Sequence, residues 1–434
     1  MDKKDRQAIL KKLGIDALNP MQEAAGKAIA SNTDVLLLSP TGTGKTLGFL
    51  LPIIESLDPA CDEVQVLIIV PSRELAIQIE QVVREMGTGY KTNAVYGGRA
   101  GAKDKLELKH RPAILIGTPG RVADHLRRER FPVEDISTLV LDEFDKSLEI
   151  GFETEMTEII DELTSVKKRI LTSATQGIEI PSFLGFGIPT VIDYLEEGVS
   201  QLAVQLVISP SKDKLGTLVD LLCDVGNQPG IIFCNFKDSI ERVSEFLTKS
   251  NISHGCFFGG LEQMDRERAL IKFRNGTHQV LIATDLAARG IDVPELKFII
   301  HYHLPLKSEE FTHRNGRTAR MNSEGTAYVL KWEGEDLPDF IESKAVKTLI
   351  QANPPAPSKW ETLFISGGRK DKISKGDIAG LFFKQGQLKK DQLGMIELKQ
   401  DCAFVAVPKL EATWVIQQVN NTKLKKKKVR VSIV

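Results

Sequence analysis

Cysteine is scarce in this chain of 434 residues, and its five cysteines are widely separated. They lie at Cys61, Cys223, Cys234, Cys256 and Cys402, and no two of them form a C-x-x-C pair. This pattern argues against a cysteine-based zinc site and against a disulfide framework. It predicts a reducing, cytoplasmic setting, in which thiols stay free.

Long apolar runs are also missing. No run approaches the roughly 20 residues that a membrane span needs, so no contact with a membrane is expected. The N-terminal residues 1–6 are mostly charged and no apolar core follows them, so no signal peptide is predicted. The apolar content of 42% and the charged content of 26% are typical of globular proteins, and the length predicts two or three domains.

The formal net charge is only −1, but it hides an uneven distribution. Residues 361–434 carry a net charge of +8, and the remainder of the chain carries −9. A basic tail on an acidic body predicts that the tail has a polyanionic partner of its own. The alternative is a solvated, lysine-rich surface without a partner.

A glycine-containing turn at residues 39–46 is the strongest chemical signal in the chain. It reads Ser-Pro-Thr-Gly-Thr-Gly-Lys-Thr, after an apolar run at 35–38 and before a helical pattern at 47–54. This order predicts a phosphate-binding loop, although Ser39 stands where the full pattern has glycine. Lys45 is expected to reach the β- and γ-phosphates, and the Thr46 hydroxyl to hold Mg²⁺. The loop itself supplies Thr41, Gly42, Thr43 and Gly44. A plain strand–helix turn is the alternative.

Apolar runs alternate with amphipathic helical patterns over most of the chain. Runs rich in Val, Ile and Leu are typical of parallel strands that are buried on both faces of a sheet. They form two series, at 35–38, 66–70, 92–96, 113–116, 138–141, 169–171 and 190–193, and then at 204–208, 230–234, 254–257, 279–283, 297–302 and 325–330. The sequence therefore predicts two α/β domains in tandem, at 1–200 and 201–352.

A proline-rich stretch at 353–360 predicts a stiff linker, because proline fixes φ and discourages helix and sheet. The segment 361–434 then has the order βαββαβ, which is typical of an α+β split βαβ domain. Its predicted strands lie at 362–366, 395–399, 403–407 and 429–433, and its helices at 375–383 and 409–419.

An acidic tetrapeptide follows the predicted strand at 138–141. A carboxylate at the end of a strand in the same sheet as the phosphate loop is placed to hold Mg²⁺, and Asp142 suits that role, largely through water. Glu143 suits the orientation and deprotonation of an attacking water. The alternative is a capped strand end with surface acids.

The second α/β domain has no Gly-Lys-Thr segment but has three arginines within seven residues, Arg314, Arg317 and Arg320. Guanidinium groups pair bidentately with phosphate oxygens, so the cluster suits phosphates better than structural contacts. A nucleotide held by the first domain would then be completed by an arginine from the second domain, and closure of the two domains would depend on ATP.

The motifs across residues 9–331 resemble those of the DEAD-box RNA helicases in order and spacing. Besides 39–46, 142–145 and 313–320, matching blocks lie at 19–22, 71–76, 97–98, 118–121, 173–175, 232–235, 263–266 and 284–292. Some positions depart from the family pattern. Phe144 replaces the usual alanine, Asn315 and Ala319 replace an apolar residue and a glycine, and Asp5 stands where an aromatic usually stacks near adenine. The last departure implies weaker adenine selectivity.

The resemblance implies two RecA-like domains and an ATP-dependent RNA helicase with RNA-stimulated ATPase activity. Gln22 would read the adenine, Asp292 would contact the ribose, and Arg317 and Arg320 would face the γ-phosphate, while Lys45 and Glu143 complete the catalytic set. Ser173 and Thr175 would couple the ATP site to RNA. The RNA backbone would lie along Pro71, Arg73, Gly98, Thr118, Arg121 and Thr284.

The C-terminal segment is similar to the RRM-like RNA-binding domain of the DbpA-type bacterial helicases, which act on ribosomal RNA during large-subunit assembly. The similarity is carried by residues 368–371, 376–378, 404–407 and 425–430. Only one aromatic of the usual strand signature is present, Phe404, so basic residues are the implied contacts. They are Arg369, Lys370, Lys425, Lys426, Lys427 and Lys428. We expect a monomer whose flexibly tethered tail holds structured ribosomal RNA.

Two alternatives stay open at this point. One is an ATP-gated RNA clamp or RNA chaperone with little strand separation, which a strand-displacement assay on a short duplex would distinguish from a helicase. The other is a DNA helicase of the wider superfamily, which comparing RNA with DNA stimulation of the ATPase would exclude or support.

Overall fold

The computed structural model describes residues 5–98, 101–175, 179–195, 201–285, 293, 296–318, 324–342 and 345–434. These residues divide into two compact units, which meet in the sequence between Ser200 and Gln201. Within the described part of the chain, none of the helices has the length and apolar character that a bilayer span requires.

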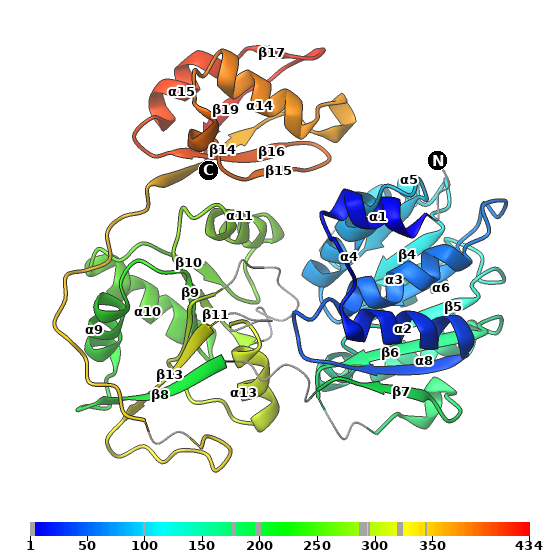
Figure 1. Cartoon of the computed structure of the whole chain (residues 1–434), viewed down its shortest axis with the longest axis horizontal. Coiled ribbons are helices and arrows are strands. Elements are labelled where there is room, and N and C mark those ends of the chain that lie inside the picture. Colours follow the sequence, from blue (N-terminus) through cyan, green and yellow to red (C-terminus); the bar gives the residue numbers. More distant parts are fainter. Residues whose placement is uncertain are drawn as a thin grey trace. The chain divides into compact units, whose positions relative to one another are not determined.

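The first unit is built on a seven-stranded parallel sheet in the order β3-β4-β2-β5-β6-β1-β7 (Figure 1). Its strands are β1 Asp34–Leu38, β2 Val66–Ile69, β3 Thr92–Val95, β4 Ile114–Gly117, β5 Thr138–Leu141, β6 Lys168–Ser173 and β7 Thr190–Asp193. Its helices are α1 Arg6–Leu13, α2 Pro20–Ser31, α3 Lys45–Ser56, α4 Arg73–Met86, α5 Gly101–Glu107, α6 Pro119–Arg127, α7 Phe144–Glu149 and α8 Glu153–Glu162, with a 3₁₀ turn η1 at Ser182–Leu184.

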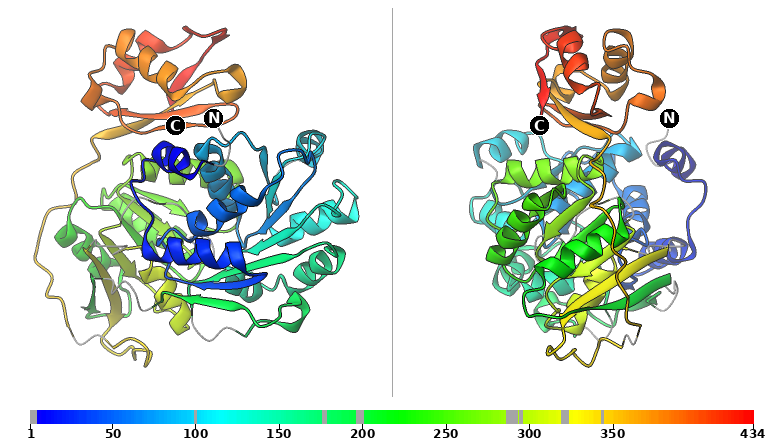
Figure 2. Two further views of the ribbon diagram at one scale, coloured as in Figure 1. Left: turned by 45° about the vertical axis from the view of Figure 1, so that its right-hand side comes forward. Right: turned by 90° about the vertical axis from the view of Figure 1, so that its left-hand side faces the viewer.

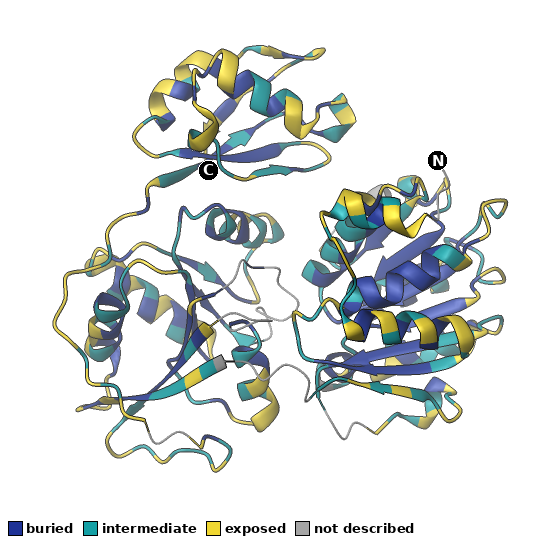
Figure 3. Cartoon of the chain, viewed as in Figure 1, coloured by how far each residue is buried: buried dark blue, intermediate teal, exposed yellow. Residues whose placement is uncertain are grey.

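The continuous apolar strands of this sheet are buried on both faces (Figure 3). In β1, Val35 and Leu37 pack into the cluster that helices α2, α3 and α4 share, whereas Leu36 and Leu38 pack into the cluster on the other face, with α6 and α8. Successive side chains of a strand point to opposite faces, so only an uninterrupted apolar run fills both layers. Phe144, which is fully buried, belongs to the second layer.

The second unit contains a six-stranded parallel sheet in the order β10-β11-β9-β12-β13-β8. Its strands are β8 Gln201–Ser209, β9 Gly230–Phe233, β10 His254–Phe257, β11 Val280–Ala283, β12 Phe298–His301 and β13 Glu324–Trp332. Its helices are α9 Leu215–Val225, α10 Lys237–Lys249, α11 Gln263–Arg274 and α13 Ser308–Asn315. Both predicted series of strands are therefore confirmed, and so is the prediction of two tandem parallel-sheet domains.

The C-terminal domain has an antiparallel sheet in the order β15-β16-β14-β19, with helices α14 and α15 on one face (Figures 1 and 2). Its elements are β14 Trp360–Ile365, α14 Lys375–Lys384, β15 Ile396–Leu398, β16 Ala403–Pro408, α15 Ala412–Val419 and β19 Val431–Ile433, with 3₁₀ turns η2 at Arg369–Asp371 and η3 at Lys390–Gln392. The predicted βαββαβ order is confirmed. A short hairpin, β17 Lys423–Leu424 and β18 Lys427–Lys428, was not predicted. The domain limits proposed from the sequence stay predictions.

The outer face of this sheet contacts helix α11 and the turn that follows it. Thr362 on β14 is fully buried, and its hydroxyl contacts the Thr277 hydroxyl at 2.7 Å and accepts from Asn275 Nδ2 at 3.2 Å. Arg274 Nε lies 2.6 Å from Glu397 Oε1. A second ion pair, Lys399 with Glu267, joins the same elements at 2.8 Å.

These contacts contradict the expectation of a flexibly tethered tail. The residues between the two domains are also held, since Ser358 donates a hydrogen bond to the Gly276 carbonyl and Ile350 N–H donates to Asp224 at 3.2 Å. The sequence did not reveal this docking because isolated threonines and asparagines are usual on exposed surfaces. In this structure the C-terminal domain belongs to the second unit and packs against α11 and the turn after it.

Candidate active site

The predicted phosphate loop connects β1 to α3 at the carboxyl end of the first sheet. Gly42 and Gly44 have φ of 85° and 84°, in the left-handed region that glycine occupies at little cost. A Cβ on Gly44 would also lie 2.4 Å from Gln22 Nε2. Ser39 stands where the pattern has its first glycine; its φ is not positive, and its hydroxyl donates to Thr43 Oγ1 at 2.7 Å.

Lys45 begins helix α3 and is 7% exposed. Its Nζ donates to the carbonyl oxygens of Ser39 and Pro40, at 2.5 and 2.9 Å. Both of these acceptors are neutral oxygens, and phosphate oxygens can take their place without leaving a buried charge unpaired. Thr46, the next residue, is half-buried.

Gln22 lies in the first turn of α2, where it forms a capping box with Asn19. Its Oε1 accepts from Asn19 N–H at 3.0 Å, and its Nε2 donates to the Gly44 carbonyl at 3.2 Å. Asn19 Nδ2 donates to the Thr43 carbonyl at 2.9 Å. The amide predicted to read adenine therefore sits directly against the phosphate loop.

Asp142 and Glu143 follow β5, and only β6 separates β5 from β1 in the sheet. Asp142 is 3% exposed, and its Oδ1 accepts a hydrogen bond from the Thr172 hydroxyl. Thr172 Oγ1 also accepts from Glu143 N–H at 3.1 Å. Glu143 has φ 49° and ψ 48°, a left-handed conformation that is uncommon outside glycine and is found at functional sites.

Burial and, to a smaller extent, the neighbouring Glu143 carboxylate together raise the pKa of Asp142 to about 6, although the Thr172 hydroxyl and the charge of Lys45 oppose the rise. A desolvated carboxylate of this kind is stabilised in its charged form by a nearby cation. Hard divalent cations prefer oxygen ligands. The Asp142 carboxylate and the Thr46 hydroxyl therefore fit Mg²⁺.

Asp145, at the end of the same tetrapeptide, is joined to the end of β6. Its Oδ2 accepts from Thr175 Oγ1 at 3.3 Å and lies 3.2 Å from Lys146 Nζ. Ser173 Oγ in turn accepts from Thr175 N–H at 3.0 Å. The small hydroxyl residues at the end of β6 are thus linked to the acidic tetrapeptide through Thr175.

The residues expected to line RNA follow three neighbouring strands, β2, β4 and β3. Pro71 and Arg73 follow β2, Gly98 follows β3, and Thr118 and Arg121 follow β4. Carboxyl ends of parallel strands share one edge of a sheet, so these residues lie on the edge that also carries the phosphate loop. Arg73 lies against the glycine turn, since a Cβ on Gly98 would be 2.6 Å from Arg73 Nη1.

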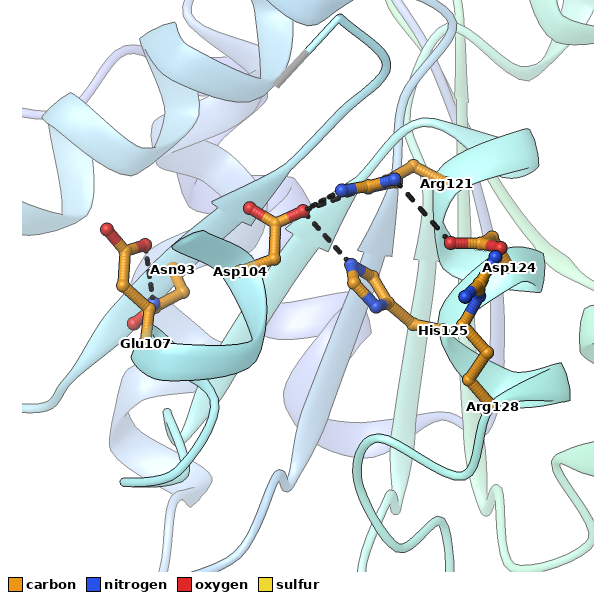
Figure 4. Close-up of polar contacts among 7 residues, drawn as sticks. All are labelled: Asn93, Asp104, Glu107, Arg121, Asp124, His125 and Arg128. Carbon is orange, nitrogen blue, oxygen red and sulfur yellow. Dashed lines mark hydrogen bonds and ion pairs between the residues drawn. The ribbon is translucent and has the colours of Figure 1, made fainter. Parts of the chain in front are cut away.

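Arg121 is held by a buried carboxylate that the sequence analysis missed (Figure 4). Asp104 of α5 has no exposed surface, and its Oδ2 accepts from Arg121 Nε at 2.9 Å and Nη2 at 2.7 Å. His125 Nε2, on α6 like Arg121, contacts the same oxygen at 3.1 Å. On its other side, Arg121 Nη1 is 3.5 Å from Asp124, whose other carboxylate oxygen binds Arg128 at 2.7 Å.

In the second unit, Arg314 is a structural residue, so the prediction that all three arginines suit phosphates is wrong for this one. It is 1% exposed, and its guanidinium donates to both Asp285 oxygens, at 2.6 and 2.5 Å. It also donates to Asn235 Oδ1 at 2.9 Å and to the His303 carbonyl at 2.8 Å. These partners follow β9, β11 and β12, so one arginine ties three strand ends together.

Asn315, which departs from the family pattern, has a buried partner. Its Oδ1 lies 3.1 Å from His301 Nε2, on β12, and His301 is fully buried. Burial, with the adjacent Arg314 guanidinium, lowers the pKa of His301 to about 3, so the imidazole is neutral and donates from Nε2. The polar substitution therefore satisfies a polar group that an apolar residue would leave unpaired.

Arg317, the second arginine of the motif, is 6% exposed, and Thr284 follows β11. Asp292, Ala319 and Arg320 lie outside the residues that the structure describes. The roles predicted for Asp292 and Arg320 stay predictions.

Several of the basic residues predicted to bind RNA in the C-terminal domain are in ion pairs. Lys370 Nζ is 2.5 Å from Asp401, Lys425 Nζ is 2.9 Å from Asp377, and Lys427 Nζ is 2.8 Å from Asp371. Lys426 and Lys428 are exposed on the hairpin and have no ion pair within the described residues.

Comparison with known proteins agrees with this geometry. Residues 19–182 match the DEAD/DEAH box helicase family, residues 213–322 the helicase conserved C-terminal domain, and residues 362–433 the DbpA RNA binding domain. The chain is 30% identical over 459 residues to the ATP-dependent RNA helicase DbpA of Bacillus subtilis (strain 168), which covers 98% of this chain and 96% of that protein. It is 31% identical over 438 residues to the protein of the same name from Escherichia coli (strain K12), with the same coverage.

Solved structures show the same likeness. Mss116p with its NTE and C-tail deleted, bound to ssRNA and AMP-PNP, has a TM-score of 0.68 at 28% identity and covers 77% of this chain and 73% of that one. Dbp5 of S. cerevisiae, bound to RNA and ADP BeF3, has a TM-score of 0.66 at 25% identity, with 74% and 86% covered.

The chain has two RecA-like domains, with a phosphate-binding loop in the first, and an RNA-binding domain follows the second in the sequence. This combination defines an ATP-dependent RNA helicase. The chain belongs to the DbpA-type DEAD-box RNA helicases. It hydrolyses ATP with stimulation by RNA, as the enzymes of this family do.

Proposed function

We propose that this helicase opens short RNA duplexes locally on ribosomal RNA, during assembly of the large subunit, as a monomer in the cytoplasm. The likeness of residues 362–433 to the DbpA RNA binding domain supports the ribosomal target. The five cysteines are free, as in a reducing compartment.

The proposed helicase mechanism depends on one observation. Asp145, in the acidic tetrapeptide of the nucleotide site, accepts a hydrogen bond from Thr175, at the sheet edge where the RNA-lining residues are proposed. Movement of the tetrapeptide on hydrolysis therefore shifts the end of β6 directly. The coupling of ATP to RNA then needs no long-range pathway.

The nucleotide half of the site has these proposed roles. Loop residues 41–44 bind the phosphates, Gln22 reads adenine and Asp292 contacts the ribose. Lys45 neutralises the β- and γ-phosphates, and Glu143 orients and deprotonates the attacking water. Thr46 and Asp142 hold Mg²⁺, which neutralises phosphate charge when bound. Arg317 and Arg320 face the γ-phosphate once the two domains close.

The RNA-binding half of the site contacts the sugar–phosphate backbone of one RNA strand and reads no bases, since phosphates and 2′-hydroxyls are alike in every sequence. In the first unit it uses Arg73 and Arg121 as charged contacts, and Pro71, Gly98 and Thr118 as close backbone contacts. Thr284 adds a contact from the second unit. Specificity is then left to the C-terminal domain, with Arg369, Lys370 and residues 425–428 as its basic contacts.

The deciding experiment is strand displacement on a short duplex, with ATP, comparing a duplex attached to a ribosomal RNA hairpin with the same duplex alone. When the hairpin is present, we expect faster strand displacement and a lower RNA concentration at half-saturation. The Glu143→Gln variant, which is expected to bind ATP and RNA with little turnover, is the control for passive binding.

ATP-dependent retention of RNA without displacement would instead indicate a clamp or chaperone. Equal rates with and without the hairpin, in the intact chain, would contradict the ribosomal target. Stimulation of the ATPase by DNA as strong as by RNA would contradict an RNA-specific core.

A further inference from the structure

Asp104, His125 and Arg121 form a polar cluster beneath the proposed RNA edge of the first sheet (Figure 4). Asp104 comes from α5 and the other two from α6, so the cluster joins two helices that follow β3 and β4. Asp104 has no exposed surface and His125 is 2% exposed, whereas the Arg121 side chain keeps 16%. Only the arginine thus reaches the surface.

The contacts converge on one oxygen. Asp104 Oδ2 accepts two hydrogen bonds from the guanidinium, at 2.9 and 2.7 Å, and lies 3.1 Å from His125 Nε2. The arginine edge that carries Nε and Nη2 is therefore fixed by the carboxylate. Nη1, at the other edge, has a long contact of 3.5 Å with Asp124.

The carboxylate could either orient the arginine for RNA or withhold it, and the burial of Asp104 decides between these roles. If RNA drew Arg121 away, a carboxylate with no exposed surface would lose two hydrogen bonds from a guanidinium, and removing a charged partner from a buried carboxylate is strongly destabilising. A single contact between an arginine and a solvated phosphate returns much less. The ion pair should therefore persist when RNA binds.

We propose that Asp104 is a positioning residue for RNA binding. It fixes the plane of the Arg121 guanidinium, with His125 as a second support, so that the arginine meets an RNA phosphate already oriented. Such preorganisation lowers the entropy lost on binding. The inference rests on the proposed RNA contact of Arg121.

The test measures the RNA concentration that half-saturates the ATPase, together with maximal turnover, in the full-length chain. Asp104→Asn keeps the shape of the side chain and removes its charge. We expect it to raise the half-saturating RNA concentration about three- to tenfold, with maximal turnover retained. Asp124→Asn is the matched control, because Asp124 is partly exposed and lies closer to Arg128 than to Arg121. It should change the half-saturating RNA concentration by less than about twofold.

The double variant separates positioning from a merely structural role. Asp104→Asn combined with Arg121→Ala should bind RNA no worse than Arg121→Ala alone, because the carboxylate acts only through the arginine. Additive losses would overturn the proposal, and so would tighter RNA binding by Asp104→Asn, which would mean that the acid withholds the arginine.

A second variant keeps the proposal testable if Asp104→Asn does not fold. Arg121→Lys leaves a cation beside Asp104 but lacks the planar guanidinium. It should raise the half-saturating RNA concentration as Asp104→Asn does, and RNA binding equal to that of the parent would overturn the proposal. If Arg121→Ala itself leaves RNA binding unchanged, the proposed RNA contact fails. If it weakens binding while Asp104→Asn does not, only the positioning role fails.

Discussion

The two parallel sheets carry cations at the same ends of their strands but hold them differently. In the first unit, Lys45 donates to the neutral carbonyls of Ser39 and Pro40. In the second, Arg314 is 1% exposed and forms its closest contacts with the Asp285 carboxylate. A phosphate can replace carbonyls without leaving a charge unpaired, but it cannot replace a buried carboxylate cheaply. The partner of a cation, and not its position alone, decides whether a ligand can use it.

Arg320→Ala should have the largest effect, because it removes the proposed finger of the second unit. We expect turnover to fall by roughly 10³–10⁵-fold, with little change in ATP affinity. Steady-state ATPase at saturating RNA, with ATP binding measured by titration, checks this. A loss below about tenfold would remove Arg320 from the role of the finger.

Glu143→Gln should lower turnover by roughly 10²–10⁴-fold while ATP and RNA still bind, because the attacking water loses its base and Asp142 remains. Single-turnover hydrolysis and RNA binding with ATP present are the measurements. Turnover near that of the parent would remove Glu143 from the role.

Arg314→Ala should act on stability rather than on chemistry alone. It leaves Asp285 at the strand ends without its cation, and breaking such a pair costs about 3–5 kcal/mol of unfolding free energy. Urea denaturation of the variant and of the parent checks this. Equal stabilities of the two proteins would contradict the structural role of Arg314.

Asp142→Asn should stabilise the chain at neutral pH. The folded pKa of Asp142, about 6, lies above the ordinary value of 3.8, so the folded state binds more protons between these values and the unfolding free energy falls as pH rises through them. Removing the charge should add about 2–3 kcal/mol at pH 7.5 and almost nothing near pH ~3. Urea denaturation at both pH values tests this, and a gain that does not vary with pH would contradict the burial argument.

Lys426→Gln with Lys428→Gln should have the smallest effect. For each phosphate that the variant no longer binds, the slope of log affinity against log salt should fall by about 0.7–0.9. The matched control changes Lys425 and Lys427, which are already paired with Asp377 and Asp371, and should reduce the slope less. Salt titrations of binding to a ribosomal RNA hairpin measure both. A larger effect in the control pair would place the RNA on the ion-paired side of the hairpin.

Much of the fold could be predicted because burial leaves a pattern in the sequence. Strands covered on both faces are continuous apolar runs, and all thirteen runs predicted in the two α/β domains are strands. The hairpin at 423–428 was missed because it is lysine-rich, has no apolar alternation and turns through Lys425 with φ 54°. Asp104 and His125 were missed because a buried ion pair between helices has no local signature.

The sequence by itself determined the class of protein, since the loop at 39–46, the tetrapeptide and the arginine motif are local patterns whose chemistry follows from residue type and order. Tertiary structure alone decided which of those charges a ligand can reach. Arg314 belongs to a motif that suits phosphates by residue type, yet it is bound to Asp285 and Asn235 from other strand ends. The docking of Thr362 on Asn275 and Thr277 was likewise decided in space. Such contacts join residues far apart in the chain, and no local pattern records them.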